Sequence, residues 1–292
     1  MGMRIRTNVS SLNAQRFMTE NTASQSQSLE RLSSGYRINK SADDAAGLAI
    51  SESLRGKVRG LGQAQRNAND AVSLVQIAEG GMTEMSNILI RMRELAVQAS
   101  TDTVGDRERG YLNREYTQLV DELDRIGKTT EFNGTRIFDT AGDKAQFVIQ
   151  VGTNGSKPEE NMDTLAINLA GLKFDSKTLG FGKESEIGPK DSSAKGPERD
   201  VIASRLGTID SALDKIASER ATLGSVQSRL GTAISSLGVQ IENMETAKSR
   251  IKDVDFASET AKATQARILT QSNLSVLTQA NAAPEMALQL LR

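Results

Sequence analysis

Candidate chemistry in this chain rests on carboxylates, because the side chains that most often act as nucleophiles and bases are missing. The sequence contains no Cys and no His, which excludes a thiolate nucleophile, a disulfide framework and an imidazole base or metal ligand. The adjacent carboxylates Asp43 and Asp44, and likewise Glu159 and Glu160, are the remaining candidates. Neighbouring residues on a helix point in different directions, so these pairs are more typical of solvated surface. We therefore expect no enzyme, no cofactor and no metal site.

Overall composition narrows the possible partners. Lys and Arg number 36 against 37 Asp and Glu, a formal net charge of −1, so the basic excess of a nucleic-acid-binding surface is missing. No apolar run approaches the roughly 18 residues that a membrane-spanning helix needs. Aromatic residues make up 3% and Trp is absent, which favours long helices packed through aliphatic side chains.

The strongest periodic pattern runs from Ile202 to Ile251. Apolar residues recur there at alternating steps of four and three, and only Arg220, Gln227 and Lys248 interrupt them. Seven heptads of this kind are typical of a coiled coil. Three glycines spaced by seven should share one face, where a neighbouring helix could approach closely: Gly224, Gly231 and Gly238.

Other segments supply partners for this helix. Residues 41–100 form a second pattern, with Ser41 as the expected N-cap and a stripe that begins at Met82. Residues 112–126 form a third. Strands are expected at residues 147–151 and 165–169, where apolar residues alternate. The fold should be mainly α: an elongated helical bundle or coiled-coil rod with a small β-hairpin region and paired terminal helices.

Both ends of the chain carry one narrow apolar stripe. An isolated helix with such a stripe is marginal in water unless the stripe is covered. We predict that residues 5–38 and 257–291 pair with each other and with neighbouring copies, and that they are disordered in the monomer and fold on assembly.

Two terminal motifs carry a family resemblance. Residues 32–50 read Leu-Ser-Ser-Gly-Tyr-Arg-Ile-Asn-Lys-Ser-Ala-Asp-Asp-Ala-Ala-Gly-Leu-Ala-Ile, and the chain ends in Leu-Gln-Leu-Leu-Arg after an earlier Gln-Ala-Asn at residues 279–281. Both resemble the corresponding ends of the bacterial flagellins. The resemblance covers residues 1–175 and 200–292, which is nearly the whole chain.

The resemblance implies a chain whose ends come together. Residues 1–45 and 255–292 would form the paired terminal coiled-coil arms, the inner domain of a filament. Residues 46–174 and 201–254 would form a helical rod domain with a small β element. Residues 175–200, rich in Gly, Pro, Lys and Ser, would be a variable surface loop in place of large outer domains.

The resemblance also implies function and partners. The chain would be a structural protomer that self-assembles into the flagellar filament for swimming motility. It would be exported through the flagellar secretion apparatus without a cleaved signal peptide, and would lie outside the cell beside hook-associated and cap proteins. In the family an export chaperone binds the C-terminal arm, here Leu274 to Leu291. The resemblance at both ends of the chain implies that large apolar residues of the arms serve polymerisation and chaperone binding, namely Val9, Leu12, Leu29, Leu32, Leu269, Val276, Leu288, Leu290 and Leu291.

One internal segment resembles the flagellin stretch that the vertebrate Toll-like flagellin receptor recognises. Residues 90–98 read Ile-Arg-Met-Arg-Glu-Leu-Ala-Val-Gln. In the family pattern an Arg, a Leu and a downstream Glu matter most, and these match Arg91, Leu95 and Glu115. Arg93 and Glu94 lie in the same segment. The resemblance implies that these residues bind the receptor.

Physical reasoning leaves two interpretations of this segment open. Arg91 and Leu95 are four residues apart and share a helix face, so together they could offer a charged donor beside an apolar contact. Alternatively, Leu95 belongs to the bundle core and Arg91 is a solvated charge. For the whole chain, the alternatives to a filament protein are a hook–filament junction protein, which shares the terminal helices, and a monomeric helical bundle.

Overall fold

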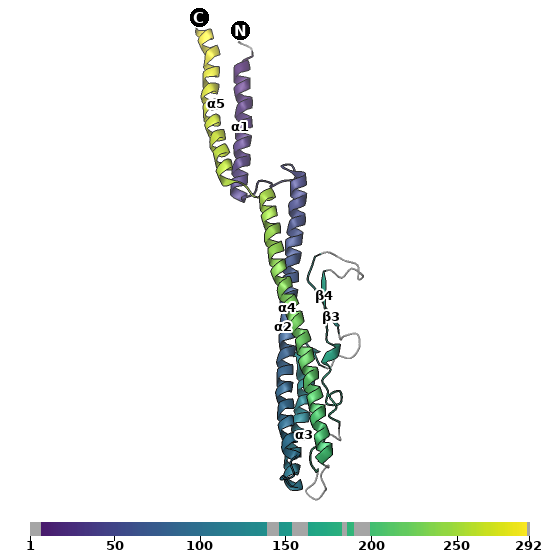
Figure 1. Ribbon diagram of the computed structural model, residues 1–292. Helices are drawn as coiled ribbons and strands as arrows, with labels where there is room; N and C mark the ends of the chain where they lie inside the picture. Colours follow the sequence, from purple (N-terminus) through teal and green to yellow (C-terminus); the bar gives the residue numbers. More distant parts are fainter. Residues whose placement is uncertain (1–6, 139–145, 154–162, 183–185, 190–198, 291–292) are drawn as a thin grey trace. The chain divides into compact units, whose positions relative to one another are not determined.

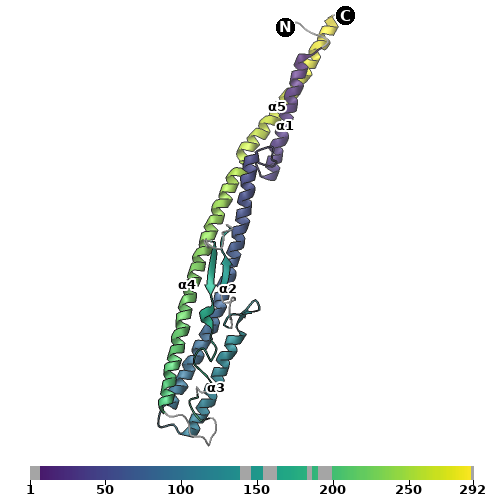
Figure 2. The same cartoon turned by 90° about the vertical axis from the view of Figure 1, so that its right-hand side faces the viewer.

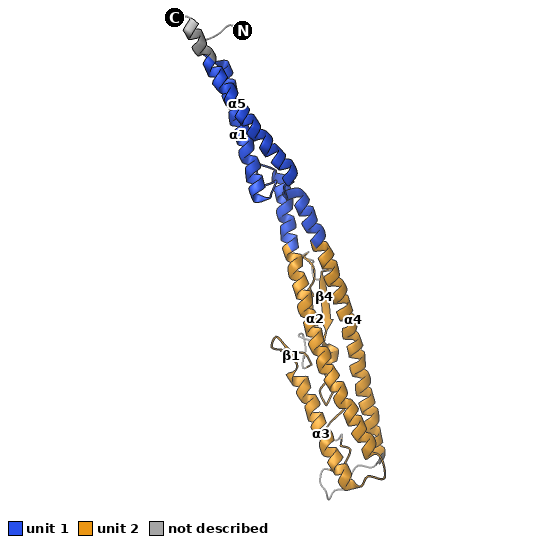
Figure 3. Ribbon diagram, turned by 90° about the vertical axis from the view of Figure 1, so that its left-hand side faces the viewer, with its two compact units in different colours: residues 1–58, 242–292 blue, residues 59–241 orange. Residues whose placement is uncertain are grey.

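The computed structural model describes residues 7–138, 146–153, 163–182, 186–189 and 199–290, with the side chains of residues 283–290 left out of the description. The chain divides into two compact units (Figure 3). Unit 1 comprises Met1–Val58 and Glu242–Arg292, and unit 2 comprises Arg59–Ile241. Residues 46–58 and 242–254, expected to belong with the rod domain, therefore fall in the unit that holds the terminal helices.

Long helices dominate the described part of the chain (Figure 1). They are α1 (Val9–Ser34), α2 (Ala45–Ala99), α3 (Asp106–Thr129), α4 (Arg199–Lys252) and α5 (Phe256–Leu290). The short strands are β1 (Glu131–Phe132), β2 (Thr135–Arg136), β3 (Gln146–Gln150) and β4 (Thr164–Asn168), followed by a 3-10 turn, η2 (Ala170–Leu172). The predicted mainly helical fold with small β-hairpins is confirmed.

The start of α2 is set by an aspartate rather than by the serine that we expected. Asp44 precedes the helix, and its Oδ1 accepts a hydrogen bond of 2.8 Å from the backbone N–H of Gly47, which is N-capping geometry. The expectation for Ser41 is wrong because residues 41–43 form a turn. In that turn the Asp43 carboxylate accepts hydrogen bonds from the backbone N–H groups of Asn39 and Lys40.

The core of unit 2 is built from α2, α3 and α4, which lie side by side (Figure 2). The heptad pattern of α4 is confirmed, because its positions within unit 2 alternate between buried and half-buried side chains. From α2 come buried methionines and leucines, and α3 contributes Tyr116 and Leu123. This clustering removes apolar surface from water and stabilises the unit.

Among the described residues, no other helix packs closely against the three evenly spaced glycines of α4. A Cβ added at Gly224, Gly231 or Gly238 would meet no atom within 4 Å. The expectation of a close helix approach is therefore wrong within the part of the chain that the structure describes, where the glycines flank the buried heptad stripe and face open space.

The β element packs on the helices of unit 2 through one face. Strands β3 and β4 are antiparallel, with Gln146 opposite Asn168 and Gln150 opposite Thr164. Leu165 and Ile167 are buried while Val148 is 61% exposed, as period-two alternation requires. Between β1 and β2, Asn133 and Gly134 have φ values of 49° and 74°, which suits a type I′ hairpin turn.

Part of the expected surface loop is core. Leu179, Phe181 and Ile187 are at most 5% exposed. Two side chains of α3 hold the segment: Asn113 Oδ1 accepts from the Ile187 N–H at 3.0 Å, and Asp124 accepts from the Ser176 N–H at 2.7 Å. The prediction that residues 175–200 form only a surface loop is wrong for these residues, since isolated apolar side chains between glycines and prolines show no period.

Candidate functional site: the terminal helix pair

A paired linker brings the two ends of the chain together in unit 1. Helix α1 ends at Gly35, whose left-handed conformation (φ 74°) lets its N–H bond the Arg31 carbonyl at 2.9 Å. The next residues pair with the segment before α5: the Arg37 N–H donates to the Lys252 carbonyl at 2.7 Å, and the Val254 N–H donates to the Gly35 carbonyl at 3.0 Å. Chain ends far apart in sequence are thereby positioned side by side.

Beyond the linker, α1 and α5 run antiparallel along each other (Figures 1 and 2). Two side-chain hydrogen bonds mark the ends of their seam. Asn8 Nδ2 donates to the Ala280 carbonyl at 2.7 Å, and Ser28 Oγ donates to Glu259 Oε1 at 2.8 Å. Ser28 lies 20 residues after Asn8, and Glu259 lies 21 residues before Ala280, so one register is kept along the whole pair.

The inward side chains of this pair are mostly small or polar. On both helices the buried and half-buried positions that follow the register recur at steps of three and four. On α1 they are Asn8, Ser11, Ala14, Met18, Asn21, Gln25 and Ser28, and on α5 they are Glu259, Ala263, Ala266, Thr270, Asn273, Leu277 and Ala280. Such a seam buries little apolar surface, so it contributes little hydrophobic stabilisation.

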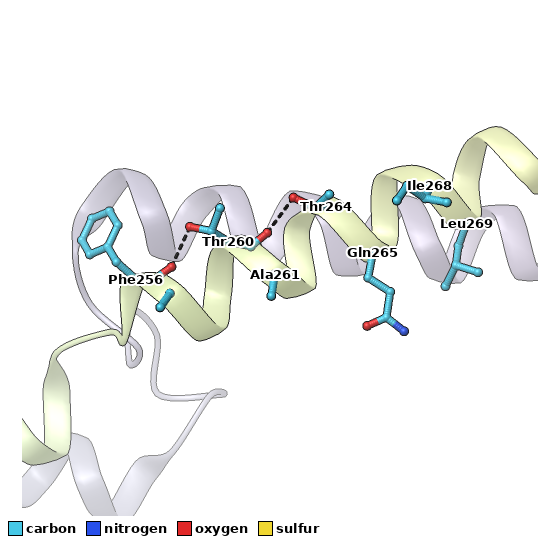
Figure 4. Close-up of a pocket in the computed structure, with 8 residues that line it drawn as sticks. Phe256, Thr260, Ala261, Thr264, Gln265, Ile268 and Leu269 are labelled. Atoms are coloured by element: carbon cyan, nitrogen blue, oxygen red, sulfur yellow. Dashed lines mark hydrogen bonds between the residues drawn. The ribbon is translucent and has the colours of Figure 1, made fainter.

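Large apolar side chains on these helices point outward instead. They are between 43% and 61% exposed and comprise Val9, Leu12, Phe17 and Leu29 of α1, with Phe256, Ile268, Leu269, Leu274 and Val276 of α5. We call this set the outward stripe. Its residues Phe256, Ile268 and Leu269 line a shallow groove along the first turns of α5 (Figure 4). Exposed apolar side chains gathered in a groove are typical of an interaction site.

The predicted polymerisation residues are thus only partly where we expected them. Val9, Leu12, Leu29, Leu269 and Val276 are exposed, and Leu32 is half-buried. The predicted pairing of the two terminal helices is confirmed, and small and polar residues occupy most of the seam between them. The side chains of Leu288 and Leu290, and all of Leu291, lie outside the described residues.

Sequence reasoning missed the buried acid of the seam. Glu259 is 4% exposed. Its Oε1 also lies 3.8 Å from Arg31 Nη1, and its Oε2 lies 3.4 Å from Lys262 Nζ. Arg31 in turn lies 3.9 Å from Asp43 Oδ1. A signal was available, since Glu259 stands on the same three-and-four spacing as Ala266 and Ala280.

Both carboxylates of this network should titrate below their ordinary range. Burial alone would raise the pKa of Glu259, but hydrogen bonds from Ser28 and Lys262 and the charges of Lys262 and Arg31 outweigh it and lower the pKa. Hydrogen bonds from the backbone of Lys40 and Asn39 lower the pKa of Asp43. The ionised forms are therefore the stabilising ones.

We expect the terminal pair to loosen in acid. A carboxyl whose pKa is lowered by folding stabilises the fold above its unfolded pKa, and this stability is lost as the pH falls through the folded pKa. The ordinary values are 4.5 for Glu259 and 3.8 for Asp43, so the loss should occur below these values. Amide hydrogen exchange of α1 and α5 at about pH 6 and pH 3, corrected for intrinsic rates, measures it. Glu259→Gln should weaken the pH dependence, and Glu20→Gln, an exposed control on α1, should leave it unchanged.

The receptor-like segment lies in unit 2 and presents charges. Arg91 Nε donates to Glu115 Oε1 at 2.9 Å, and Arg91 Nη1 donates to Glu94 Oε2 at 2.9 Å. Arg93 Nε donates to Asp210 Oδ1 at 2.8 Å. The side chains of Arg91, Arg93, Glu94 and Glu115 are 45–60% exposed. The fold therefore gathers Arg91, Glu94 and Glu115 from α2 and α3 into one surface cluster.

Leu95 does not belong to that surface. Its side chain is 1% exposed and lies in the apolar core of unit 2. The interpretation in which Arg91 and Leu95 form an exposed pair is wrong, because Leu95 continues the buried stripe that includes Leu89 and Met92. Ile90 and Val97, each 48% exposed, are the apolar side chains of the segment that solvent reaches.

No arrangement for catalysis emerges within the described residues. Asp43 and Asp44 organise the turn and cap α2, and Glu159 and Glu160 fall outside the description. In the described part of the chain, no three acidic side chains gather as metal ligands. None of its helices has the length and hydropathy for a membrane crossing.

Comparison with known proteins agrees with this architecture. Residues 5–143 match the bacterial flagellin N-terminal helical region, and residues 206–291 match the bacterial flagellin C-terminal helical region. A flagellin of Halalkalibacterium halodurans is 40% identical over 294 residues, which cover 99% of this chain and 100% of the relative. A flagellin of Bacillus subtilis is 37% identical over 304 residues, with the same coverage.

A solved structure shares the fold alone. The putative flagellar hook-associated protein from Vibrio parahaemolyticus is 14% identical, with a TM-score of 0.58, and the match covers 72% of this chain and 100% of that chain. The sequence matches decide the family. This chain belongs to the bacterial flagellin family, as a structural subunit of the flagellar filament.

Proposed function

We propose that the chain polymerises through the outward stripe of its terminal helix pair. The single observation that carries this proposal is the inverted arrangement of the pair, with small and polar residues in the seam and large apolar residues on the outside. A helix pair that folds only to bury its own surface would be built the other way round. Neighbouring copies are the partner that a filament subunit meets at every position.

The magnitudes support assembly through this stripe. Full burial of a Val, Leu or Phe side chain stabilises by about 1.5–3 kcal/mol, and the stripe offers nine large apolar residues. Association costs on the order of 4–15 kcal/mol in lost freedom, so burial of most of the stripe offsets that cost. Head-to-tail contacts that do not close generate a helical filament. Because the seam itself buries little apolar surface, we also propose that the terminal helices form a marginally stable pair in the monomer and are stabilised further on assembly.

The exposed apolar residues of the terminal helices also bear on export and on the proteins that the chain would meet before and after it. We propose that the chain leaves the cell through the flagellar secretion apparatus without a cleaved signal peptide, and that an export chaperone covers Leu274 to Leu291 beforehand. Leu274 and Val276 are each 50% exposed, which supports a need for cover. Contacts with hook-associated and cap proteins would use the same terminal helices.

Recognition of the monomer by the vertebrate Toll-like flagellin receptor is a second proposal. The exposed cluster of Arg91, Glu94 and Glu115, with Arg93 beside it, supports it. Charged groups of this kind favour specific, bidentate contacts. Leu95 would contribute only by supporting the helix from within.

The alternative of a hook–filament junction protein has weaker support. The hook-associated protein that this chain is similar to is only 14% identical, so that similarity concerns the fold alone. The flagellins match at 37–40% identity along the full chain. We therefore design the experiments to test the role of a filament subunit.

Seeded polymerisation tests assembly through the terminal helices. We expect electron microscopy to show filaments from the full chain and none from residues 46–255, which lack all of α1 and α5. Circular dichroism of the truncated chain should still show helix, as a control for folding. Filaments from the truncated chain would refute the role of the terminal pair, and failure of the full chain even on seeds would favour the junction protein.

A further inference from the structure

The terminal pair contains an unusual side chain for its position. Among the described residues, Glu259 is the one charged side chain that is fully buried. It lies in a seam that has almost no apolar core: among the described side chains of α1 and α5, the buried hydrophobic residues are Ala14 and Ala266. Burying a charge is costly unless it is paired and hydrogen-bonded. The Glu259 carboxylate meets this condition through Ser28, Lys262 and Arg31, so its burial depends on partners from both helices.

The composition of the seam indicates what these contacts do. Small side chains give shallow knobs and holes, so the apolar contacts of α1 and α5 discriminate poorly between registers. The paired linker holds the base of the pair through residues 35–37 and 252–254, and the Ser28–Glu259 contact lies in the first turns beyond it, while α1 continues for 26 residues. At 1.5 Å per residue that is about 40 Å of helix beyond the linker. A directional polar contact inside the seam can set a register where apolar packing cannot.

The partners that Glu259 has on α1 belong to the observed register. Ser28 and Arg31 of α1 face it, Lys262 lies beside it on α5, and Asp43 of the linker reaches it through Arg31. A slip of one heptad moves the carboxylate about 10 Å along α1, away from Ser28 and Arg31. The same slip would separate Asn8 from the Ala280 carbonyl. It would also displace the outward stripe of α5 by the same distance relative to that of α1.

We propose that Glu259 is the positioning residue that fixes the register of α1 against α5, and thereby the apolar surface offered to neighbouring copies. Only the second part of this inference, the surface offered to neighbouring copies, rests on the proposed assembly function. The register itself is a property of a single chain. It can therefore be measured whether or not the chain polymerises.

Cysteine reporters can measure the register, because the chain has no Cys of its own. The native register places Ser11 opposite Leu277, so Ser11→Cys with Leu277→Cys reports it. A slip by one heptad is reported by Ser11→Cys with Thr270→Cys. Disulfide yield is compared under mild oxidation in the full-length monomer. It is compared again in filaments made with an excess of the Cys-free chain, where bonds form within one molecule.

The disulfide yield of the native reporter should exceed that of the slipped reporter by about tenfold or more. A slip would lose a buried hydrogen bond to a charged group, and the cost of that loss corresponds to this ratio. Glu259→Ala should bring this ratio close to one. Glu259→Gln should give an intermediate ratio, since its amide oxygen still accepts from Ser28 but no longer attracts Arg31. Glu20→Ala, an exposed acid of α1, is the matched control and should leave the ratio unchanged. A purely structural role would lower helix content without changing the ratio.

An unchanged ratio in Glu259→Ala would overturn the proposal, as would equal yields from both reporters in the parent chain. If neither reporter forms a disulfide in Glu259→Ala, the same two reporters are measured in Ser28→Ala. This variant removes only the hydrogen bond from Ser28 to Glu259. An unchanged ratio in Ser28→Ala would then refute the inference. A chain that holds its register but forms no filaments refutes the proposed function alone. Filaments without a register preference refute this inference alone.

Discussion

Replacing Ile268 and Leu269 by Gln is expected to abolish filament formation while leaving the monomer folded. Both side chains lie in the groove of α5 and are 61% and 43% exposed, so the monomer loses little by the change. In a filament they would be buried, and each would stabilise by about 1.5–3 kcal/mol. Loss of both corresponds to an increase of about 100-fold or more in the critical concentration.

Sedimentation of polymer over a range of total concentrations measures this effect, and circular dichroism confirms that the variant retains its helices. Gln271→Ala is the matched control, because it truncates an exposed polar side chain on the same helix without removing apolar surface. We expect its critical concentration to equal that of the parent chain. Normal filaments from the double Gln variant would contradict the role of the outward stripe and direct attention to unit 2.

The second large effect is expected in unit 2, where Leu95→Ala should destabilise the fold. Leu95 is 1% exposed within the apolar core, and truncation of a buried Leu to Ala costs about 2–5 kcal/mol. Denaturant unfolding of the full chain, followed by helix content, measures the change. An effect below about 1 kcal/mol would contradict the buried position of this side chain.

Arg91→Ala is the informative partner of that substitution. Its ion pairs with Glu94 and Glu115 are half exposed, and such surface pairs contribute only about 0–1 kcal/mol. We expect Arg91→Ala to leave stability nearly unchanged while lowering receptor signalling by the monomer. Loss of signalling in Leu95→Ala would then follow from weakened packing. Full signalling by Arg91→Ala would refute the proposed receptor surface.

The helices and much of the core could be predicted from the sequence. The heptads between Ile202 and Ile251 fixed which face of α4 is buried, because a helix places residues three and four apart on one side. The strands β3 and β4 were predictable for a similar local reason, because their apolar residues alternate. The motifs at residues 32–50 and at the C-terminus by themselves indicated the flagellin family.

Tertiary structure alone decided which partner covers each face. Periodicity gives the angular position of a side chain on its own helix, but it does not say whether that face meets a partner or solvent. Leu95 is therefore buried where an exposed contact was conceivable. Ile187 joins the core because Asn113 of α3 binds its backbone. In the terminal pair, Glu259 and Ser28 turn the polar faces inward. Val9, Leu12, Leu29, Leu269 and Val276, which we expected to serve polymerisation, are left on the outside of the pair, where we propose that a neighbouring subunit buries them.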